Sequence, residues 1–284
     1  MTAKENKIAP TANGLYGFLE EKIPKELSCD WDNDGRMVVP DGNRTIKKVL
    51  ITLDVSEGAV DYAAENGFDC IISHHPLIFN PVKSVDVSFP IGRKLCKIIQ
   101  NGICVFSFHT RLDAVDGGVN DVLARLLKLK DVERFSDVGR MGYVVSDACL
   151  RVSERFGTLV REALSPDGPL TFIDGGRPVK KVAIVGGSGK DYLEEAIEAG
   201  CDTFITGEMP FNRYHDAKEL GLNVIIGGHY FTENPVCNRL SELVREYDSD
   251  IEIEIFESKP AFVREKGHSR AIQNGQLIVT HGNE

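Results

Sequence analysis

The sequence predicts an α/β protein with two related lobes whose mainly parallel sheets face each other. Three observations support this prediction. Short apolar runs that suit buried strands alternate with segments of helical periodicity, a pattern typical of parallel strands joined by right-handed crossovers. The pattern is repeated once along the chain, and in each copy a histidine follows the end of a strand. A length of 284 residues accommodates two such lobes.

The first copy is preceded by a helix and a turn. Thr11 can cap a helix that ends before Pro24. Residues 30–35, which read Asp-Trp-Asp-Asn-Asp-Gly, contain the only tryptophan of the chain. We interpret this segment as a turn anchored by the tryptophan. The alternative is that Asp32 or Asn33 faces a functional site.

Strands and helices then alternate to the end of the first copy. Continuous apolar runs predict strands that are covered on both faces, and Gly67 and Gly102 stand where helices are expected to end. The predicted strands are residues 48–53, 69–72 and 103–108, and the predicted helices are residues 60–66 and 91–100.

A comparison of the two halves of the chain reveals the second copy. A shift of 133 residues places residues 47–75 on residues 180–208 without a gap. Farther on, a shift of 120 residues places His109-x-x-x-Asp113 on His229-x-x-x-Glu233. Each copy therefore ends a strand with a histidine that is followed four residues later by a carboxylate.

The remaining segments complete the two predicted lobes. A helix is expected around residues 153–164, and another is expected to begin at Thr232 or Asn234 with Pro235 in its first turn. The alternating run 251–256 predicts a strand with one face in water, which can pack back on the first lobe. The first lobe is expected at residues 1–135 and the second at residues 136–284.

The composition argues against several classes of function. A formal net charge of −10 without a basic cluster argues against binding of nucleic acid phosphates. The chain has no apolar run of membrane-spanning length and no apolar segment of a signal peptide near residue 1, so a cytoplasmic protein is expected. Seven cysteines without a Cys-x-x-Cys pair argue against a disulfide framework and a zinc–thiolate site.

Two adjacent histidines, His74 and His75, mark the predicted functional site. They follow a buried strand and precede Pro76, which cannot continue a central strand. In open α/β sheets, ligands bind at the carboxyl ends of the strands. Both rings can converge there only where the backbone turns, because neighbouring side chains on a strand point to opposite faces. A dinuclear metal site suits this arrangement, and a histidine pair without a ligand is the alternative.

The histidine–carboxylate pairs of the two copies extend this site into a metal-binding cleft. Three imidazoles and two carboxylates suit zinc, iron, manganese, cobalt or nickel, and do not suit calcium or magnesium alone. Five side chains fill two coordination spheres only by sharing, so we expect a bridging carboxylate and the open positions of a catalytic site. Ordinary structural roles for these residues would not predict the repeated spacing. The proposed ligands of two divalent metal ions are His74, His75, Asp113, His229 and Glu233.

Two further features are candidates for function. His109 mirrors His229 in the repeat, and we place it behind the ligands as the candidate catalytic residue that orients a ligand or carries protons. Residues 183–189 follow a strand and precede a helix, as a phosphate-cradling loop would, but they lack the spacing of a Walker loop. A plain strand-to-helix turn is the preferred interpretation of this segment.

Four separated motifs resemble the NGG1-interacting-factor-3-like family of dinuclear metal-centre proteins, many of which are labelled GTP cyclohydrolase I type 2 homologues. Residues 30–35 and 53–56 are also similar to amino-terminal motifs of that family. The likeness covers nearly the whole chain. The four motifs are Ser73-His-His-Pro76, His109-Thr-x-Leu-Asp113, Phe204-Ile-Thr-Gly-Glu208 and Gly228-His-Tyr-x-Thr-Glu233.

The resemblance implies two α/β lobes, a toroidal homohexamer, and two metal ions held in the cleft by the same five residues. The extra domain that some members carry between their lobes is expected to be absent, because the stretch 131–179 is short. Arg111 stands where the family usually has a smaller residue. We expect its guanidinium either to bind an anionic substrate or to pair with a surface acid.

Two functions from different classes are consistent with these observations. The first is a metal-dependent hydrolase, similar to the GTP cyclohydrolase homologues, that acts on a small-molecule substrate. The second is a non-catalytic protein that binds or stores metal, or that serves as an oligomeric scaffold. Turnover by the metal-loaded protein separates the two.

Overall fold

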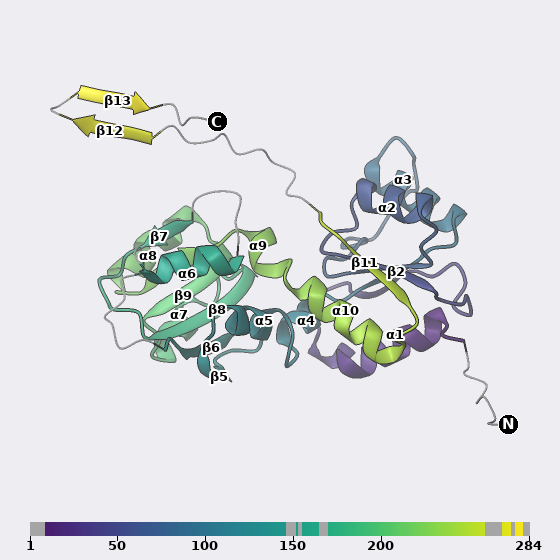
Figure 1. The fold of residues 1–284 in the computed structure, drawn as a ribbon, viewed down its shortest axis with the longest axis horizontal. Helices are drawn as coiled ribbons and strands as arrows, with labels where there is room; N and C mark the ends of the chain where they lie inside the picture. The colour runs from purple at the N-terminus through teal and green to yellow at the C-terminus, as the bar shows by residue number, and fades with distance from the viewer. Residues whose placement is uncertain are drawn as a thin grey trace.

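The computed structural model has two large sheets on either side of four helices, and a separate two-stranded sheet (Figure 1). The four helices are α4 (Thr110–Ala114), α5 (Val119–Leu126), α9 (His229–Glu233) and α10 (Val236–Tyr247). The structure describes residues 9–145, 152, 155–164, 170–258, 269–273 and 276–280. Strands and helices alternate along most of the chain, so the prediction of an α/β protein with two related lobes is confirmed. Among the described residues, no helix combines the length and the apolar character that crossing a bilayer requires.

The first sheet has five strands, and its three central strands are parallel. Its edge strand β1 is antiparallel to β4, and the other edge strand, β11, is parallel to β2. The central strands are buried on both faces, as their continuous apolar sequences predict. In spatial order the strands are β1 (Gly35–Val38), β4 (Cys104–Ser107), β3 (Cys70–Ser73), β2 (Lys48–Thr52) and β11 (Glu252–Phe256).

Helices cover both faces of the first sheet. On one face, α2 (Glu57–Glu65) and α3 (Pro90–Gln100) pack side by side and bury Leu95 and Ile98. On the other face lie α1 (Ala12–Lys22), capped by the Thr11 hydroxyl as predicted, and α10 (Val236–Tyr247) (Figure 1).

The second sheet has six strands and the same parallel centre, β8–β9–β10. Helices α5 (Val119–Leu126) and α6 (Arg155–Leu164) pack on one face, and α7 (Leu193–Glu198) and α8 (Phe211–Glu219) pack on the other. In spatial order the strands are β5 (Lys130–Arg134), β6 (Arg140–Tyr143), β8 (Lys181–Ser188), β9 (Thr203–Glu208), β10 (Asn223–Ile226) and β7 (Thr171–Ile173). A separate antiparallel pair is formed by β12 (Ser269–Gln273) and β13 (Gln276–Thr280).

The two lobes repeat the same topology, which extends farther than the sequence comparison showed. In each lobe an antiparallel edge strand, β1 or β7, pairs with the third parallel strand. The Asp69 carboxylate accepts hydrogen bonds from the backbone N–H groups of Lys47 and Lys48. The Asp202 carboxylate does the same for the equivalent residues, Lys180 and Lys181. The edge strands escaped the comparison because they precede the aligned segments.

The chain crosses back to the first lobe near its C-terminal end. The short helix α9 (His229–Glu233) contains Thr232, so the expected cap at Thr232 or Asn234 is wrong, and Pro235 occupies the N-cap position of α10. Helix α10 leads to β11, which adds to the first sheet beside β2 and has the partly exposed side chains that its alternating sequence predicts. The first sheet therefore contains strands from both ends of the chain.

Candidate metal centre

Three turns at the carboxyl ends of parallel strands bring the predicted site residues together. His74 and His75 follow β3, and His109 caps the short helix α4 (Thr110–Ala114) that follows β4. His229 begins α9, which follows β10 in the other lobe. In both short helices the carboxylate lies four residues after the histidine, so a single turn directs both side chains the same way.

The Glu233 carboxylate lies at the centre of the cluster. Its Oε2 atom is 2.9 Å from His75 Nε2 and 3.0 Å from His229 Nε2, and its Oε1 atom is 3.8 Å from His74 Nε2. The side chain is 6 % exposed. Burial by itself raises the pKa of this carboxyl, but the imidazoles of His229, His74 and His75 that face it outweigh burial and hold the pKa well below its usual value. Glu233 is therefore a buried anion that faces three imidazoles.

The His74 ring has one buried nitrogen without a hydrogen-bond partner. Its Nδ1–H donates to the carbonyl oxygen of Phe108 at 2.9 Å, which leaves the Nε2 lone pair directed into the cluster. Nε2 lies 3.7 Å from Asp113 Oδ1 and 3.8 Å from Glu233 Oε1, and no hydrogen-bond partner reaches it among the described residues. Buried polar atoms are rarely left unpaired. An imidazole lone pair that faces two carboxylates, with no hydrogen-bond donor in reach among the described residues, suits a cation ligand.

The other two predicted histidine ligands are oriented by carboxylates outside the cluster. His75 Nδ1 lies 2.7 Å from Asp54 Oδ1, and His229 Nδ1 lies 3.3 Å from Glu208 Oε1. Burial lowers the pKa of His75, but Asp54 and Glu233 raise it to about 10. Hydrogen bonding to Glu233 raises the pKa of His229 to about 9 despite burial. A carboxylate on the far nitrogen is the usual support of a metal-bound histidine.

His109 lies inside the same cluster. A nitrogen of its ring and ring nitrogens of His74 and His75 all lie within 4.8 Å of one another. Its Nδ1 is 2.9 Å from Asp32 Oδ1, and Asp32 Oδ2 accepts hydrogen bonds from the backbone and hydroxyl of Thr110. Burial raises the pKa of Asp32, but the bonds from His109 and Thr110 outweigh it and lower the pKa to about 2.

The interpretation of residues 30–35 as a turn alone is therefore wrong. Asp32 reaches the site through His109, and Asp54 and Glu208 support the other histidines. Sequence reasoning kept Asp32 as an alternative site residue but missed Asp54 and Glu208. Their positions in the sequence could have indicated this role, because Asp54 follows the first strand of its copy and Glu208 aligns with His75 in the repeat.

Three overlapping groups of donor atoms could each hold a metal ion among the described residues. Glu233 belongs to two of them, which is the arrangement expected for a bridging carboxylate. Imidazole and carboxylate donors together suit the first-row divalent ions. The residues present therefore fit the predicted kind of site. The groups are His75, His229 and Glu233; His74, Asp113 and Glu233; and His74, His75 and His109.

The glycine segment 186–189 packs against the cluster and does not form a phosphate loop. Strand β8 continues to Ser188 with an irregular register, so the expected strand-to-helix turn at this point is also wrong. The backbone N–H groups of Gly186, Gly187 and Gly189 donate to side-chain oxygens of the protein, and a phosphate would have to displace them. Gly187 has a φ of +61°, and a Cβ there would overlap with Glu233 Oε1.

The Arg111 guanidinium is completely buried, so it does not face a substrate, but its NH1 atom lies 3.6 Å from Oε1 of Glu20, whose side chain is 42 % exposed. Its Nε–H donates to Asp34 Oδ2 at 3.0 Å, and an NH1 hydrogen donates to the carbonyl oxygen of Ile23 at 3.1 Å. Asp34 Oδ2 also accepts the backbone N–H of His109. Arg111 thus holds the turn 30–35 against α4. The expectation that it binds a substrate is wrong, whereas the expected pairing with a surface acid is seen at Glu20.

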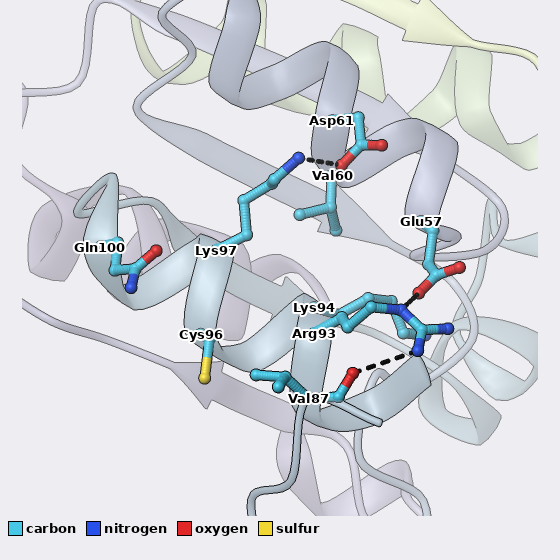
Figure 2. A pocket seen from close by; sticks show the side chains of 9 residues that line it. All are labelled: Glu57, Val60, Asp61, Val87, Arg93, Lys94, Cys96, Lys97 and Gln100. Atoms are coloured by element: carbon cyan, nitrogen blue, oxygen red, sulfur yellow. Dashed lines mark hydrogen bonds and ion pairs between the residues drawn. The ribbon is translucent and has the colours of Figure 1, made fainter. Parts of the chain in front are cut away.

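A hollow of about 410 Å³ between α2 and α3 differs from the cluster, because its charged groups are paired with protein partners (Figure 2). Arg93 pairs with Glu57, and Lys97 pairs with Asp61. Lys94 donates to the carbonyl oxygen of Val55. A charged ligand would have to break these contacts to bind in the hollow.

The fold and the cluster define a two-lobed α/β protein with a histidine–carboxylate site that is suited to divalent metal ions. The chain belongs to the Duf34/NIF3 (NGG1p interacting factor 3) family, because a model of that family matches residues 10–261. This finding confirms the family resemblance that the four sequence motifs indicated.

Curated relatives and solved structures agree with this assignment. The chain is 34 % identical over 249 residues to the GTP cyclohydrolase 1 type 2 homolog of Clostridium perfringens, covering 84 % of this chain and 94 % of that protein. A Staphylococcus aureus hypothetical protein is similar with a TM-score of 0.81 and 26 % identity, covering 91 % and 100 % of the two chains. Reduced HcgD from Methanocaldococcus jannaschii is similar with a TM-score of 0.76 and 27 % identity, covering 89 % and 99 %.

Proposed function

We propose that the protein is a metal-dependent hydrolase that uses two divalent ions. The observation that carries this proposal is the position of Glu233, whose Oε2 atom faces two imidazoles while its Oε1 atom faces the unpaired nitrogen of His74. One carboxylate placed in this way can serve two ions. The residues that would hold the ions are His74, His75, Asp113, His229 and Glu233.

The chain's own groups support hydrolysis at this site. Bound divalent ions would supply Lewis-acid chemistry, polarising a substrate oxygen and making water a nucleophile near neutral pH. The Asp32 carboxylate holds the Nδ1–H of His109, so the Nε2 atom of His109 is left to accept or deliver a proton beside the cluster. Burial of Glu233 and His74 excludes water from one side of the reacting centre.

The names of the relatives suggest which substrates to test first. The Clostridium relatives are called GTP cyclohydrolase 1 type 2 homologs, so GTP and other nucleotides lead the series. Phosphoesters and cyclic amides extend it, because the same chemistry attacks carbon or phosphorus centres. Assembly into a homohexamer is part of the proposal and is checked by sedimentation.

A metal analysis joined to activity assays tests the proposed function. Protein purified without added metal is analysed by element, loaded with zinc, iron, manganese, cobalt or nickel, and assayed against the substrate series. The expected result is about two ions per chain and turnover, with both lost in Glu233→Gln. The matched control is Glu242→Gln, an exposed glutamate on α10, which should retain both.

The opposite outcome favours the non-catalytic alternative. If the loaded protein hydrolyses nothing in the series and releases its ions to a chelator without unfolding, the site stores or delivers metal. Turnover that persists in Glu233→Gln would contradict the proposal directly.

A further inference from the structure

Two exposed aromatic side chains lie beside the donor cluster. Trp31, the only tryptophan of the chain, is 65 % exposed, and Phe79 is 46 % exposed. They come from different segments, the turn 30–35 and the loop after β3, yet their ring centroids are 6.1 Å apart. A single exposed aromatic residue is ordinary, whereas two that meet beside a polar cluster indicate a binding surface.

Both rings contact His109 edge to face. The ring centroid of His109 lies 6.2 Å from that of Trp31 and 6.1 Å from that of Phe79, with interplanar angles of 78° and 86°. The same His109 ring lies 5.3 Å from that of His74. The aromatic pair is therefore continuous with the predicted metal ligands.

The aromatic pair is held in place by the protein before any ligand arrives. The Asn33 side-chain amide donates to the carbonyl oxygen of Ile78 at 2.5 Å, which ties the segment carrying Trp31 to the segment carrying Phe79. Between Trp31 and Asn33, the Asp32 side chain is anchored to His109 and Thr110. Such preorganisation removes part of the entropy cost of binding.

The groups that could have bound phosphate near the cluster have other roles. Arg111 is buried in its pair with Asp34, and three N–H groups of the segment 186–189 donate to protein oxygens. A ligand that binds beside the cluster would therefore be recognised by the ring faces of Trp31 and Phe79. Phe79 also lines a hollow of about 610 Å³, which provides room for a substituent carried by a bound ring.

We propose that Trp31 and Phe79 form a stacking platform that binds a planar heteroaromatic ring of the purine type and presents it to the proposed metal site. Stacking on exposed aromatic faces is tolerant of the identity of the ring and gives substantial binding energy in water. The inference rests on the proposed function, because it names the substrate class of the same site.

Trp31 supplies its own assay. Excitation at the red edge of tryptophan absorption reports on this one side chain, since the chain has no other tryptophan. The metal-loaded protein is titrated with guanosine, with adenosine and with ribose 5-phosphate. We expect saturable quenching by the two nucleosides and no change with the sugar phosphate. Phe79→Ala should weaken nucleoside binding about tenfold or more.

A matched control separates stacking from general surface effects. Phe211→Ala removes a phenylalanine that is 73 % exposed on α8, outside the cluster, and should leave nucleoside affinity unchanged. Trp31→Phe keeps an aromatic face, so calorimetry should show binding close to that of the unsubstituted protein. Circular dichroism of each variant checks that the fold is retained.

The outcomes separate this inference from the proposed function. Nucleoside binding without any turnover leaves the platform standing and contradicts the hydrolase. Hydrolysis that proceeds at an unchanged rate and KM in Phe79→Ala overturns the platform alone. Dissociation of an oligomer by Phe79→Ala, with nucleoside affinity unaltered, also overturns it and makes the aromatic pair a contact between subunits.

Discussion

The Glu233 side chain determines the electrostatics of the whole cluster. Its carboxylate is almost completely buried, and the imidazoles of His75 and His229 lie within hydrogen-bonding distance of it. In the absence of a metal ion, protonation of these rings compensates the buried charge, which is why their pKa values rise. A divalent cation would replace those protons, so metal binding should release protons into solution.

The metal-free protein should lose stability as the pH rises above 6.5. The pKa values of about 10 for His75 and about 9 for His229 exceed the ordinary value of 6.5. A group whose pKa is raised by folding stabilises the folded state fully at any pH below its pKa in the unfolded chain. This stabilisation is lost as the pH rises through its pKa in the folded protein. The thermal midpoint of metal-free protein should therefore decrease between pH 6.5 and pH 10.

Scanning calorimetry across this pH range measures the effect. Glu233→Gln serves as the comparison, because it removes the common partner of both rings while general alkaline effects remain. A decrease that is equally steep in Glu233→Gln would show that the pairing of the two histidines with Glu233 does not cause it.

Replacement of Arg111 by methionine should destabilise the protein by about 3 kcal/mol, because it leaves the buried Asp34 carboxylate without its guanidinium partner. Lys25 still contacts Asp34, which places the cost near the lower end for a broken buried pair. Urea unfolding gives the value. Arg239→Met, which breaks an exposed pair with Glu242, should cost below about 1 kcal/mol. Equal costs for the two variants would contradict the buried role of Arg111.

At the scale of elements, one-turn helices at strand ends position the chemistry. Helices α4 and α9 each place a histidine and a carboxylate one turn apart, and the central strands of both lobes end toward the cluster. Strand β8 adds Gly187, whose left-handed backbone conformation and missing side chain let the backbone lie close to the Glu233 side chain. The irregular end of β8 is therefore part of the site.

Gly187→Ala should weaken metal binding as well as stability. The φ of +61° costs a side chain about 1–2 kcal/mol, and the added Cβ would push Glu233 out of position. We expect metal affinity, measured by calorimetric titration, to fall at least about tenfold. Gly200→Ala is the control, because it has a φ of +77° and no neighbour within 4 Å of its Cβ. It should lose a similar amount of stability and keep its metal affinity.

At the scale of the whole molecule, the two lobes share one apolar core. Val49 and Ile72 of the first sheet belong to the same buried cluster as Val182 and Ile205 of the second. Helix α10 packs against α1 and α5 and carries the chain back to β11 in the first sheet. Neither lobe can separate without exposing apolar surface.

The protein should consequently unfold in one cooperative transition. Trp31 fluorescence reports on the first lobe, and far-ultraviolet circular dichroism reports on helices of both lobes. In urea the two signals should give coincident midpoints. If metal is bound as proposed, its removal by a chelator should shift both midpoints downward together, because the proposed ligands come from both lobes. A second transition seen by circular dichroism alone would show that the lobes unfold separately.

The sequence by itself determined the alternation of strands and helices, the internal repeat and the family. These features depend on local periodicity and on spacing along the chain, so they can be read from residues that are close together in the sequence. The histidine–carboxylate pairs belong here as well, because each pair lies within one helical turn.

The tertiary structure decided what depends on residues far apart in the chain. Burial against Asp34 and Ile23 keeps Arg111 away from a substrate, and the hydrogen bond to His109 makes Asp32 a supporting residue of the site. The edge positions of β1 and β7, and the return of β11 to the first sheet, are likewise long-range pairings. Hydrogen bonds and burial of this kind leave no periodic trace in the sequence, because the chain between the partners can vary without changing the contact.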